Sequence, residues 1–346
     1  MKIINVIPIA KTVFKGELSY FTTEENIWVG SLVTIPVRSK MIHGIVVSVR
    51  NAEEAKAEIK SADFAIKKIE EIHPENFLTT EFVDSCKKTA EYFATGIGPV
   101  INSMVPKKIL GNLDKIKNKH EFENKISFHD NLATQADEEE RYTNYKSFIR
   151  EEFARKSSVF FCLPTLEDIK KTKILLEKGI EKYTFVIHNS LSTSELVDVW
   201  NNILKEKHPI LIISTGSFLC LPRKDIGTIV LEREGSRAYK SQIRPYLDTR
   251  IFVEIFAKKI KAKMLLGDSL LRTETIWRQK AGEIAEFRSL KFRSLSTAEE
   301  ILVDMKTKKE KNGHEAWKII STELEELIHK IKNSSENLFI FGVRKG

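Results

Sequence analysis

The chain has 346 residues, of which 42% are hydrophobic and 30% charged, a composition that excludes wholesale disorder and favours about two folded domains. Lys and Arg exceed Asp and Glu to give a formal net charge of +8, which by itself only weakly favours a polyanionic partner such as DNA. We expect neither a membrane span nor a secretory leader, because no stretch reaches ~18 apolar residues and the start turns polar early.

The three cysteines, Cys86, Cys162 and Cys220, lie far apart and lack the spacing of metal-binding pairs. A disulfide framework and a zinc ribbon are therefore excluded, and the cysteine usage predicts a reducing, cytoplasmic location. No Ser/His/Asp, Cys/His or metal-ligand cluster has convincing spacing. The sequence thus predicts no catalytic residues, no metal and no bound cofactor.

The first part of the chain predicts a small β-rich domain. Residues 38–41 resemble a hairpin turn with a basic tip, and Pro36 places the strand before it at an edge or at its own end. A helix with an apolar stripe begins at Thr80 and stops near Gly96. We expect this domain to cover residues 1–106, with strands at Ile3–Ile9, Leu18–Phe21, Leu32–Val37, Ile42–Val49 and Phe64–Ile72.

Residues 107–130 are polar and rich in Lys and Asn, which predicts a linker. Beyond the acidic run Asp137–Glu140, expected to be a solvated loop, apolar strand-length runs alternate with capped amphipathic helices. This alternation predicts a parallel α/β sheet over residues 131–288, and one further strand–helix–strand unit over 289–346. The expected strands are Ser158–Leu163, Tyr183–His188, Pro209–Ser214, Thr228–Leu231, Met264–Gly267, Glu300–Met305 and Leu338–Val343.

Short sequence motifs along almost the whole chain resemble those of the primosomal protein N′ (PriA) family of replication-restart helicases. The resemblance rests first on VIPIA, LSYF, VGSLVTIPV, HGIVVSV and AEYFATGIGPVINSMVP, and then on VFFCLPT, VIHNSLSTSE, DVW, IISTGSFLCLP, DIGTIVLEREGSRAYK, RPYLDTR, MLLGD, VDM and FIFGVRKG. It implies a domain that binds the 3′ end of a DNA strand, then a RecA-like helicase lobe, then part of a second lobe. Overall we predict a multi-domain α/β protein.

The family's ATPase motifs are altered in this chain. Such helicases cradle ATP phosphates in a Gly-rich loop ending in Gly-Lys-Ser/Thr, but the chain contains no Gly-Lys dipeptide. The stretch expected to hold that loop reads Leu132–Arg141, with three glutamates that would repel a triphosphate. The Asp-Glu-x-His motif aligns with Glu232-Arg233-Glu234-Gly235, and Asp268-Ser269-Leu270 replaces Ser-Ala-Thr. These departures predict that ATP hydrolysis is lost, although the enzyme assignment stays open.

In the family, an aromatic residue and an Asp stand at the positions of Leu18 and Ser19, in the pocket for the terminal nucleotide. Because these two residues offer neither a π-face nor a carboxylate, recognition of the 3′ end is in doubt even if DNA binding survives. The candidate DNA-binding residues are Leu18, Ser19, Tyr20, Gly30, Arg38 and Lys40. A second basic set, equally readable as a solvated face, comprises Lys258, Lys259, Lys261, Lys263, Arg288 and Arg293.

Three functional hypotheses follow. The first is a DNA-binding protein of replication restart or repair that binds forked or 3′-ended DNA, has lost its ATPase, and contacts other replication or primosome proteins without any membrane. The second is an ATP-dependent 3′–5′ DNA helicase of the primosome whose catalytic groups are completed by a partner. The third is a protein-interaction scaffold with little affinity for DNA.

Overall fold

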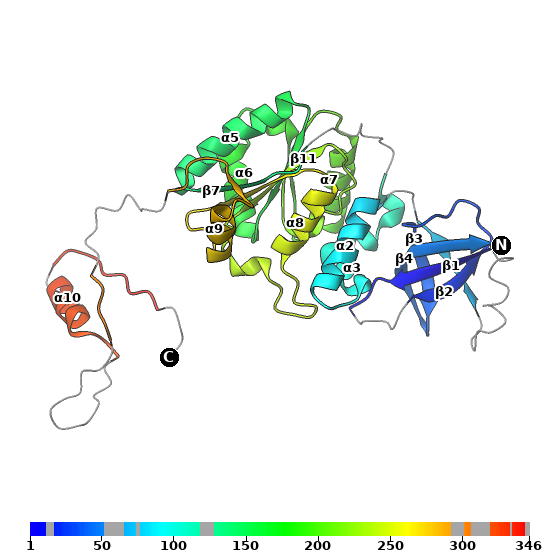
Figure 1. The fold of residues 1–346 in the computed structure, drawn as a ribbon, viewed down its shortest axis with the longest axis horizontal. Helices are drawn as coiled ribbons and strands as arrows, with labels where there is room; N and C mark the ends of the chain where they lie inside the picture. The colour runs from blue at the N-terminus through cyan, green and yellow to red at the C-terminus, as the bar shows by residue number, and fades with distance from the viewer. Residues whose placement is uncertain are drawn as a thin grey trace, which may run out of the picture. The chain divides into compact units, whose positions relative to one another are not determined.

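The structure is a computed structural model that describes residues 1–11, 17–51, 66–73, 77–117, 128–291, 301–305, 319–332 and 334–342. The chain divides into two compact units, Met1–Arg293 and Ser294–Gly346. The larger unit contains a small barrel and a parallel sheet with helices between and around them (Figure 1). Among the described residues, no helix is long and apolar enough to cross a membrane.

The N-terminal sheet curls into a barrel. The strand order is β5-β2-β1-β4-β3-β6, and residues 67–73 close it by hydrogen-bonding to both outer strands, with Ile69 N donating to Phe21 O and Glu70 N donating to Thr34 O. Alternate side chains point inward and form an apolar interior around Ile4, Val33 and Val46. The strands are β1 (Lys2–Pro8), β2 (Leu18–Thr22), β3 (Leu32–Val37), β4 (Lys40–Asn51), β5 (Lys67–Lys68) and β6 (Glu71–Ile72).

The second sheet is parallel throughout, with the order β13-β7-β12-β11-β8-β10-β9. Its central strands read as continuous apolar runs because helices cover both faces, as a parallel sheet requires. Strand order departs from chain order, so neighbours in the sheet are distant in sequence. The strands are β7 (Asn131–Gln135), β8 (Ser158–Cys162), β9 (Thr184–Ile187), β10 (Leu211–Ser214), β11 (Ile226–Glu232), β12 (Lys263–Asp268) and β13 (Ala285–Glu286).

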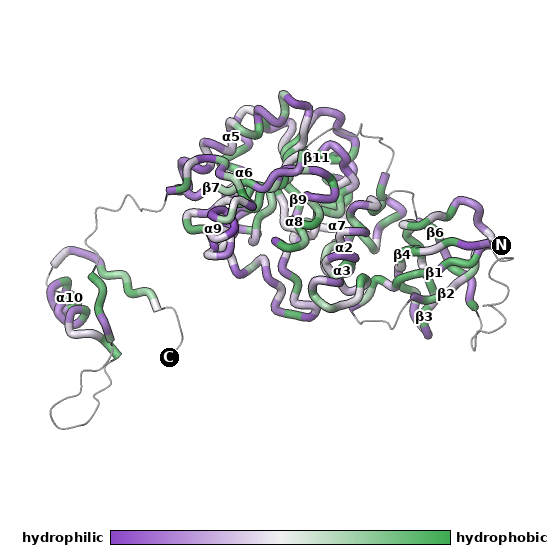
Figure 2. Tube along the Cα trace, viewed as in Figure 1, coloured by the Kyte–Doolittle hydropathy of each residue, from purple (hydrophilic) through white to green (hydrophobic). Residues whose placement is uncertain are grey.

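Successive side chains of each strand point to opposite faces of the parallel sheet, and each face has its own hydrophobic core. Phe161 and its same-face neighbours pack under α5 (Glu138–Ala154) and α6 (Leu166–Leu176). Many residues along α5 are hydrophilic (Figure 2). Phe160 and its neighbours face the opposite side, under α7 (Thr193–Lys205) and α8 (Thr249–Lys259). The remaining elements of this region are α9 (Thr273–Lys280) and the short 3₁₀ turns η2 (Glu181–Tyr183), η3 (Gly216–Phe218) and η4 (Arg237–Tyr239).

Several predicted helix starts are confirmed. Ser192 and Glu195 form a reciprocal capping box at the start of α7, and the Thr165 side chain accepts from Asp168 N at the start of α6. The run Asp137–Glu140 was expected to be a solvated loop, and that expectation is wrong. Asp137 caps α5 by accepting from Glu140 N, and the three glutamates form the first turn, where negative charge favours the helix dipole.

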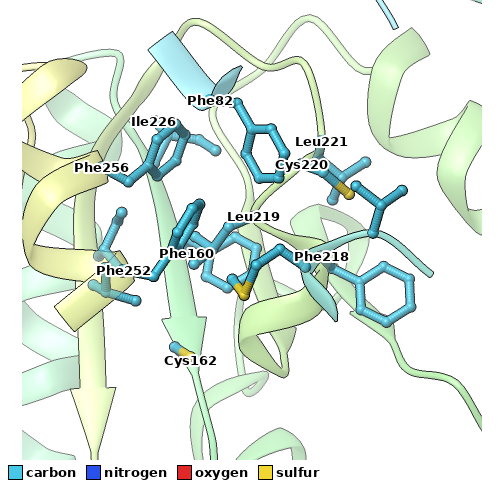
Figure 3. Close-up of a cluster of buried hydrophobic side chains, with 14 of the residues drawn as sticks. Phe82, Phe160, Cys162, Phe218, Leu219, Cys220, Leu221, Ile226, Phe252 and Phe256 are labelled. Atoms are coloured by element: carbon cyan, nitrogen blue, oxygen red, sulfur yellow. The ribbon is translucent and has the colours of Figure 1, made fainter. Parts of the chain in front are cut away.

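Helices from the N-terminal region join the barrel to the parallel sheet. Gly98, at the start of α3, approaches Pro8 so closely that a Cβ atom there would lie 2.1 Å from the Pro8 carbonyl oxygen. On the other side, the Phe82 ring of α2 meets Phe252 and Phe256 of α8 edge to face, at 5.4 and 6.0 Å between centroids (Figure 3). The helices concerned are α2 (Thr80–Tyr92), α3 (Ile97–Met104) and α4 (Lys107–Leu110).

The expected linker is folded over its first part. Residues 107–116 form α4 and the turn η1 (Leu113–Lys115), and their apolar side chains are buried in the same core as α7. Asn201 of α7 fastens this segment, since its side chain donates to Lys115 O and accepts from Lys117 N. The polar composition of residues 107–116 did not predict this packing, because the few apolar residues stand among polar ones. The domain boundaries at 106, 130 and 288 remain predictions.

The unit Ser294–Gly346 contains one described helix, α10 (Thr322–Lys332), as the sequence predicted. The flanking strands are a wrong prediction over their described parts, because residues 301–305 and 338–342 form no strand. A strand needs a hydrogen-bonded neighbour, and the described residues of this unit provide none.

The Phe82 contact predicts cooperative unfolding of the larger unit. Replacing Phe82 with Ala should lower the free energy of unfolding by about 3–5 kcal/mol, because it empties a fully buried ring site. Urea unfolding followed by circular dichroism measures this change. Tyr92→Ala on the same helix is the control and should cost less than about 1 kcal/mol, since its ring is 65% exposed. Equal, small losses in both variants would show that the aromatic junction contributes little.

Candidate nucleic-acid interface

Strand register brings several predicted DNA-binding residues to one end of the barrel. Val6 pairs with Leu18, Pro8 pairs with Gly44, and Val37 pairs with Lys40 across the hairpin turn. Because these neighbours are antiparallel, the end of β1, the start of β2 and the β3–β4 turn lie at the same end of the barrel. We call this end the barrel mouth, formed by Leu18, Tyr20, Pro36, Val37, Arg38, Lys40 and Met41.

The inner side of the barrel mouth is apolar and closed by a hydrogen bond. Leu18 packs against the barrel interior, and Tyr20 is almost fully buried, with its Oη donating to Pro36 O at 3.1 Å. Burial raises the pKa of Tyr20. Tyr20 therefore stays a neutral donor that holds β2 against the end of β3, and its ring is not available for stacking on a base.

The rim of the barrel mouth is cationic and exposed. Arg38 and Lys40 both point into solvent, and Arg38 adopts a left-handed backbone conformation with φ 54° that the tight turn requires. Lys67, which the sequence reasoning missed, pairs in register with Tyr20 and is also exposed. Met41, 54% exposed, adds an apolar surface beside these charges. The cationic side chains are placed to contact phosphates of a nucleic-acid strand, and Met41 is placed to contact a base.

Two predicted residues lie elsewhere. Ser19 faces the outside of the barrel, where its Oγ donates to Asn5 Oδ1 and Asn5 Nδ2 donates to Glu17 Oε2. Gly30, with φ 96°, donates its N–H to Val46 O, six residues along β4 from Lys40. The structure therefore groups Leu18, Tyr20, Arg38 and Lys40, and separates Ser19 by face and Gly30 by distance along the strand.

Two lysines of the second basic set pair with carboxylates. Lys259 pairs with Asp84 at 2.8 Å, Lys263 pairs with Glu152 at 2.9 Å, and Arg288 stacks over Phe287. Arg293 lies outside the described residues. Among the described members of this set, Lys259 and Lys263 are thus engaged by carboxylates, which leaves fewer free charges for a phosphate backbone.

The carboxyl ends of the parallel strands form the edge where such sheets bind ligands. Only Ala136 and Asp137 separate the end of β7 from the start of α5, which is too short for an eight-residue phosphate-binding loop. Asp137 already accepts from the first turn of α5, and Lys171 and Lys291 pair with Glu138 and Glu140 of that turn. The amides and cations that would hold a phosphate chain are therefore engaged internally.

A buried ion pair occupies this edge beside β11. Arg141 Nη2 lies 2.5 Å from Glu232 Oε1, and the two side chains are only 3% and 1% exposed. Tyr145 Oη donates to Glu232 Oε2 at 2.6 Å. Burial raises the pKa of Glu232, and the hydrogen bonds from Arg141 and Tyr145 oppose that rise. Gly267 on β12 completes the packing, because a Cβ atom there would lie 1.9 Å from Tyr145 Oη.

The residues after Glu232 are fastened to other elements. Arg233 pairs with Asp168 of α6 at 2.5 Å, and Glu234 accepts from Thr275 Oγ1 of α9 at 2.8 Å. Asp268, at the end of β12, accepts from Gly235 N at 2.7 Å. The carboxylates at this edge thus hold neighbouring helices and loops together.

Sequence reasoning missed the roles of Arg141, Tyr145 and Asp168. One available signal was the i, i+4 spacing of Arg141 and Tyr145 within the apolar stripe of α5, which places an arginine on the buried face of the helix. A buried arginine requires a partner, but its identity depends on β11 and α5 being neighbours across the sheet.

The ion pair predicts that removing one partner lowers the free energy of unfolding much more than replacing both partners. Arg141→Met should lower the free energy of unfolding by about 3–5 kcal/mol, because it leaves the buried Glu232 carboxylate without its partner. Arg141→Met combined with Glu232→Leu should recover most of that loss. Urea unfolding of both variants tests this.

The control for this comparison is Arg233→Met, which removes an arginine that is 57% exposed and should cost about 1 kcal/mol or less. A loss below about 1 kcal/mol for Arg141→Met would contradict the assigned role of the ion pair.

Comparison with known proteins gives a family match for the first part of the chain. Residues 6–106 match the family model of the PriA 3′ DNA-binding domain (3′BD). That match covers the barrel and the helices α2 and α3, so it includes the barrel mouth.

Curated relatives extend the likeness into the parallel sheet. The replication restart protein PriA of Rickettsia prowazekii is 25% identical over 287 residues, covering 76% of this chain and 42% of the relative. The PriA protein of Helicobacter pylori strain J99 is 22% identical over 263 residues, covering 73% of this chain and 40% of the relative. The chain therefore spans about two fifths of the length of these relatives.

Among solved structures, the C-terminal domain of Saccharomyces cerevisiae Dbp5 overlaps 46% of this chain and 89% of its own, with 13% identity and a TM-score of 0.33. That overlap is too slight to bear on function. The match of the 3′ DNA-binding domain and the PriA relatives together show that this chain is similar to part of the PriA replication restart proteins.

Proposed function

We propose that this chain is a DNA-binding protein of replication restart that binds forked or 3′-ended DNA and does not hydrolyse ATP. The observation that carries the first part is the barrel mouth, where exposed Arg38 and Lys40 stand beside apolar Leu18 and Met41 within the matched 3′ DNA-binding domain. Lysine and arginine neutralise phosphates, and the apolar surface accepts a base.

The second part of the proposal is supported by the carboxyl edge of the parallel sheet. A helicase lobe needs a phosphate cradle, a metal-binding carboxylate and a group that orients the attacking water. Here the cradle has two residues, the carboxylate of Glu232 is held by Arg141, and Arg233 stands where the water-orienting carboxylate is expected. An arginine does not deprotonate, so it cannot act as that base.

Charge reversal at the barrel mouth tests DNA binding. Arg38→Glu combined with Lys40→Glu should weaken binding to a fork with a free 3′ end by about tenfold or more. It should also reduce the slope of log affinity against log salt by about 1.4–1.8, because two phosphate contacts are lost. Fluorescence anisotropy at several salt concentrations measures both quantities.

The matched control reverses two exposed lysines on α6, Lys170 and Lys173, which changes the net charge equally. If this control weakens binding as much as the mouth variant, the barrel mouth is not the site. A parent protein that binds a 3′-hydroxyl fork better than a 3′-phosphate fork would support recognition of the end itself. Absence of DNA binding by the parent would favour the scaffold hypothesis.

The ATPase prediction is tested in the purified chain. We expect no hydrolysis of ATP above background with or without forked DNA, and no increase in melting temperature with Mg-ATP. Glu232→Gln provides the control, since any activity that it shares with the parent comes from a contaminant. Turnover that disappears in Glu232→Gln would restore the helicase hypothesis.

A further inference from the structure

The amino-terminal edge of the parallel sheet lies opposite the edge that carries the ion pair, and it has a different charge pattern. One exposed lysine stands just before each of five strands. Four of them precede their strand by two residues and the fifth, Lys207, by four. We call this set the lysine row, and its members are Lys156 before β8, Lys182 before β9, Lys207 before β10, Lys224 before β11 and Lys261 before β12.

Sheet topology converts these dispersed residues into a continuous series. The five strands are neighbours in the order β12-β11-β8-β10-β9, so the lysines stand in the spatial order 261, 224, 156, 207 and 182. Adjacent strands are ~4.8 Å apart, which makes the row about 19 Å long. One strand of duplex DNA presents about five or six phosphates over that length, at ~3.4 Å each.

A buried network holds the central loops of the row in place. Arg223 Nη2 contacts Asp225 Oδ2 at 2.5 Å, and its Nη1 donates to Glu206 O at 2.8 Å. Ser158 Oγ donates to the same Asp225 carboxylate at 2.5 Å, and Ser158 N donates to Asp225 O. The loops that carry Lys156, Lys207 and Lys224 are thereby tied to one another, so the lysines stand on a fixed base.

The acidic groups at this edge are engaged locally. Asp225 is held by Arg223, the Glu206 carboxylate accepts from His208 N, and the Glu181 carboxylate accepts from Gly179 N. No carboxylate of the described residues forms an ion pair with Lys156, Lys207 or Lys224. Exposed Asp130 lies before β7, beyond the Lys261 end of the row. The row is therefore a cationic strip with free ammonium groups at its centre.

We propose that the lysine row binds the phosphate backbone of a DNA duplex, such as an arm of the fork whose strand end occupies the barrel mouth. This inference rests on the proposed DNA-binding function and adds a second contact surface to it. Single-stranded sites combine charge with aromatic stacking platforms. The five positions of the row carry only lysines, and Tyr183 beside Lys182 is itself covered by the His208 ring at 3.8 Å. A series of cations along one edge of a sheet instead suits the charged backbone of a duplex.

The test is a triple charge reversal, Lys156→Glu, Lys207→Glu and Lys224→Glu, in the full chain. Binding to a fork with a 20-base-pair duplex arm should weaken by about 30-fold or more. The slope of log affinity against log salt should fall by about 2.7, the value for three lost phosphate contacts. Binding to a single-stranded oligonucleotide with a free 3′ end should stay within about threefold of the parent.

The control variant Lys170→Glu, Lys173→Glu and Lys280→Glu makes the same change in net charge on exposed helices. It should alter fork binding by less than about fivefold. Circular dichroism checks that each variant is folded, and the corresponding Lys→Gln triple replaces the reversal if it is not, with a similar loss of slope expected.

An unchanged salt slope, or an equal loss in the control, would overturn the role of the lysine row. Loss of binding to a polyglutamate peptide with duplex binding intact would also overturn it and assign the row to an acidic protein partner. The two sites are told apart by also measuring both variants on the single-stranded oligonucleotide with a free 3′ end. The row variant should bind it like the parent, and the Arg38 and Lys40 variant should bind it more weakly. Failure of the row therefore leaves the proposed function standing, and failure at the mouth leaves the duplex result interpretable.

Discussion

The contact of Phe82 with Phe252 and Phe256 is the constraint on which the organisation of the larger unit depends. Phe82 lies on α2, within the region matched by the 3′ DNA-binding domain. Its ring is nevertheless buried against α8, which covers one face of the parallel sheet. A shared core of this kind has a low tolerance for relative motion, since packed interiors resist deformation. The barrel mouth and the parallel sheet thus belong to one compact unit, joined through this aromatic contact.

The ion pair of Arg141 and Glu232 shows how side chains of the chain itself hold the carboxyl edge of the parallel sheet. A carboxylate buried there without a cation would be costly. Arg141 provides that cation from within the fold, Tyr145 satisfies the second oxygen, and Arg233 and Glu234 fasten the adjoining helices. Order at this edge then depends on these internal contacts.

Local signals predicted much of the fold. Apolar runs located the central strands, and capping residues located the starts of α6 and α7, because both depend on short-range chemistry. The altered motif at Glu232 and Arg233 was also readable. What could not be predicted depends on which distant segments are neighbours. The partner of Arg141, the burial of residues 107–116 and the alignment of Lys156 with Lys207 and Lys224 follow from topology, and adjacent strands here are distant in sequence.

The close approach of Gly267 to Tyr145 and Glu232 limits the substitutions that this edge can accept. Any side chain on Gly267, or the loss of Arg141, disturbs a site that is already filled, so single substitutions toward an open pocket weaken the fold before they gain a ligand. Typical domains have only about 5–15 kcal/mol of stability, which leaves little room for such intermediates. Gly267 is therefore a position that accepts no side chain unless Tyr145 and Glu232 move.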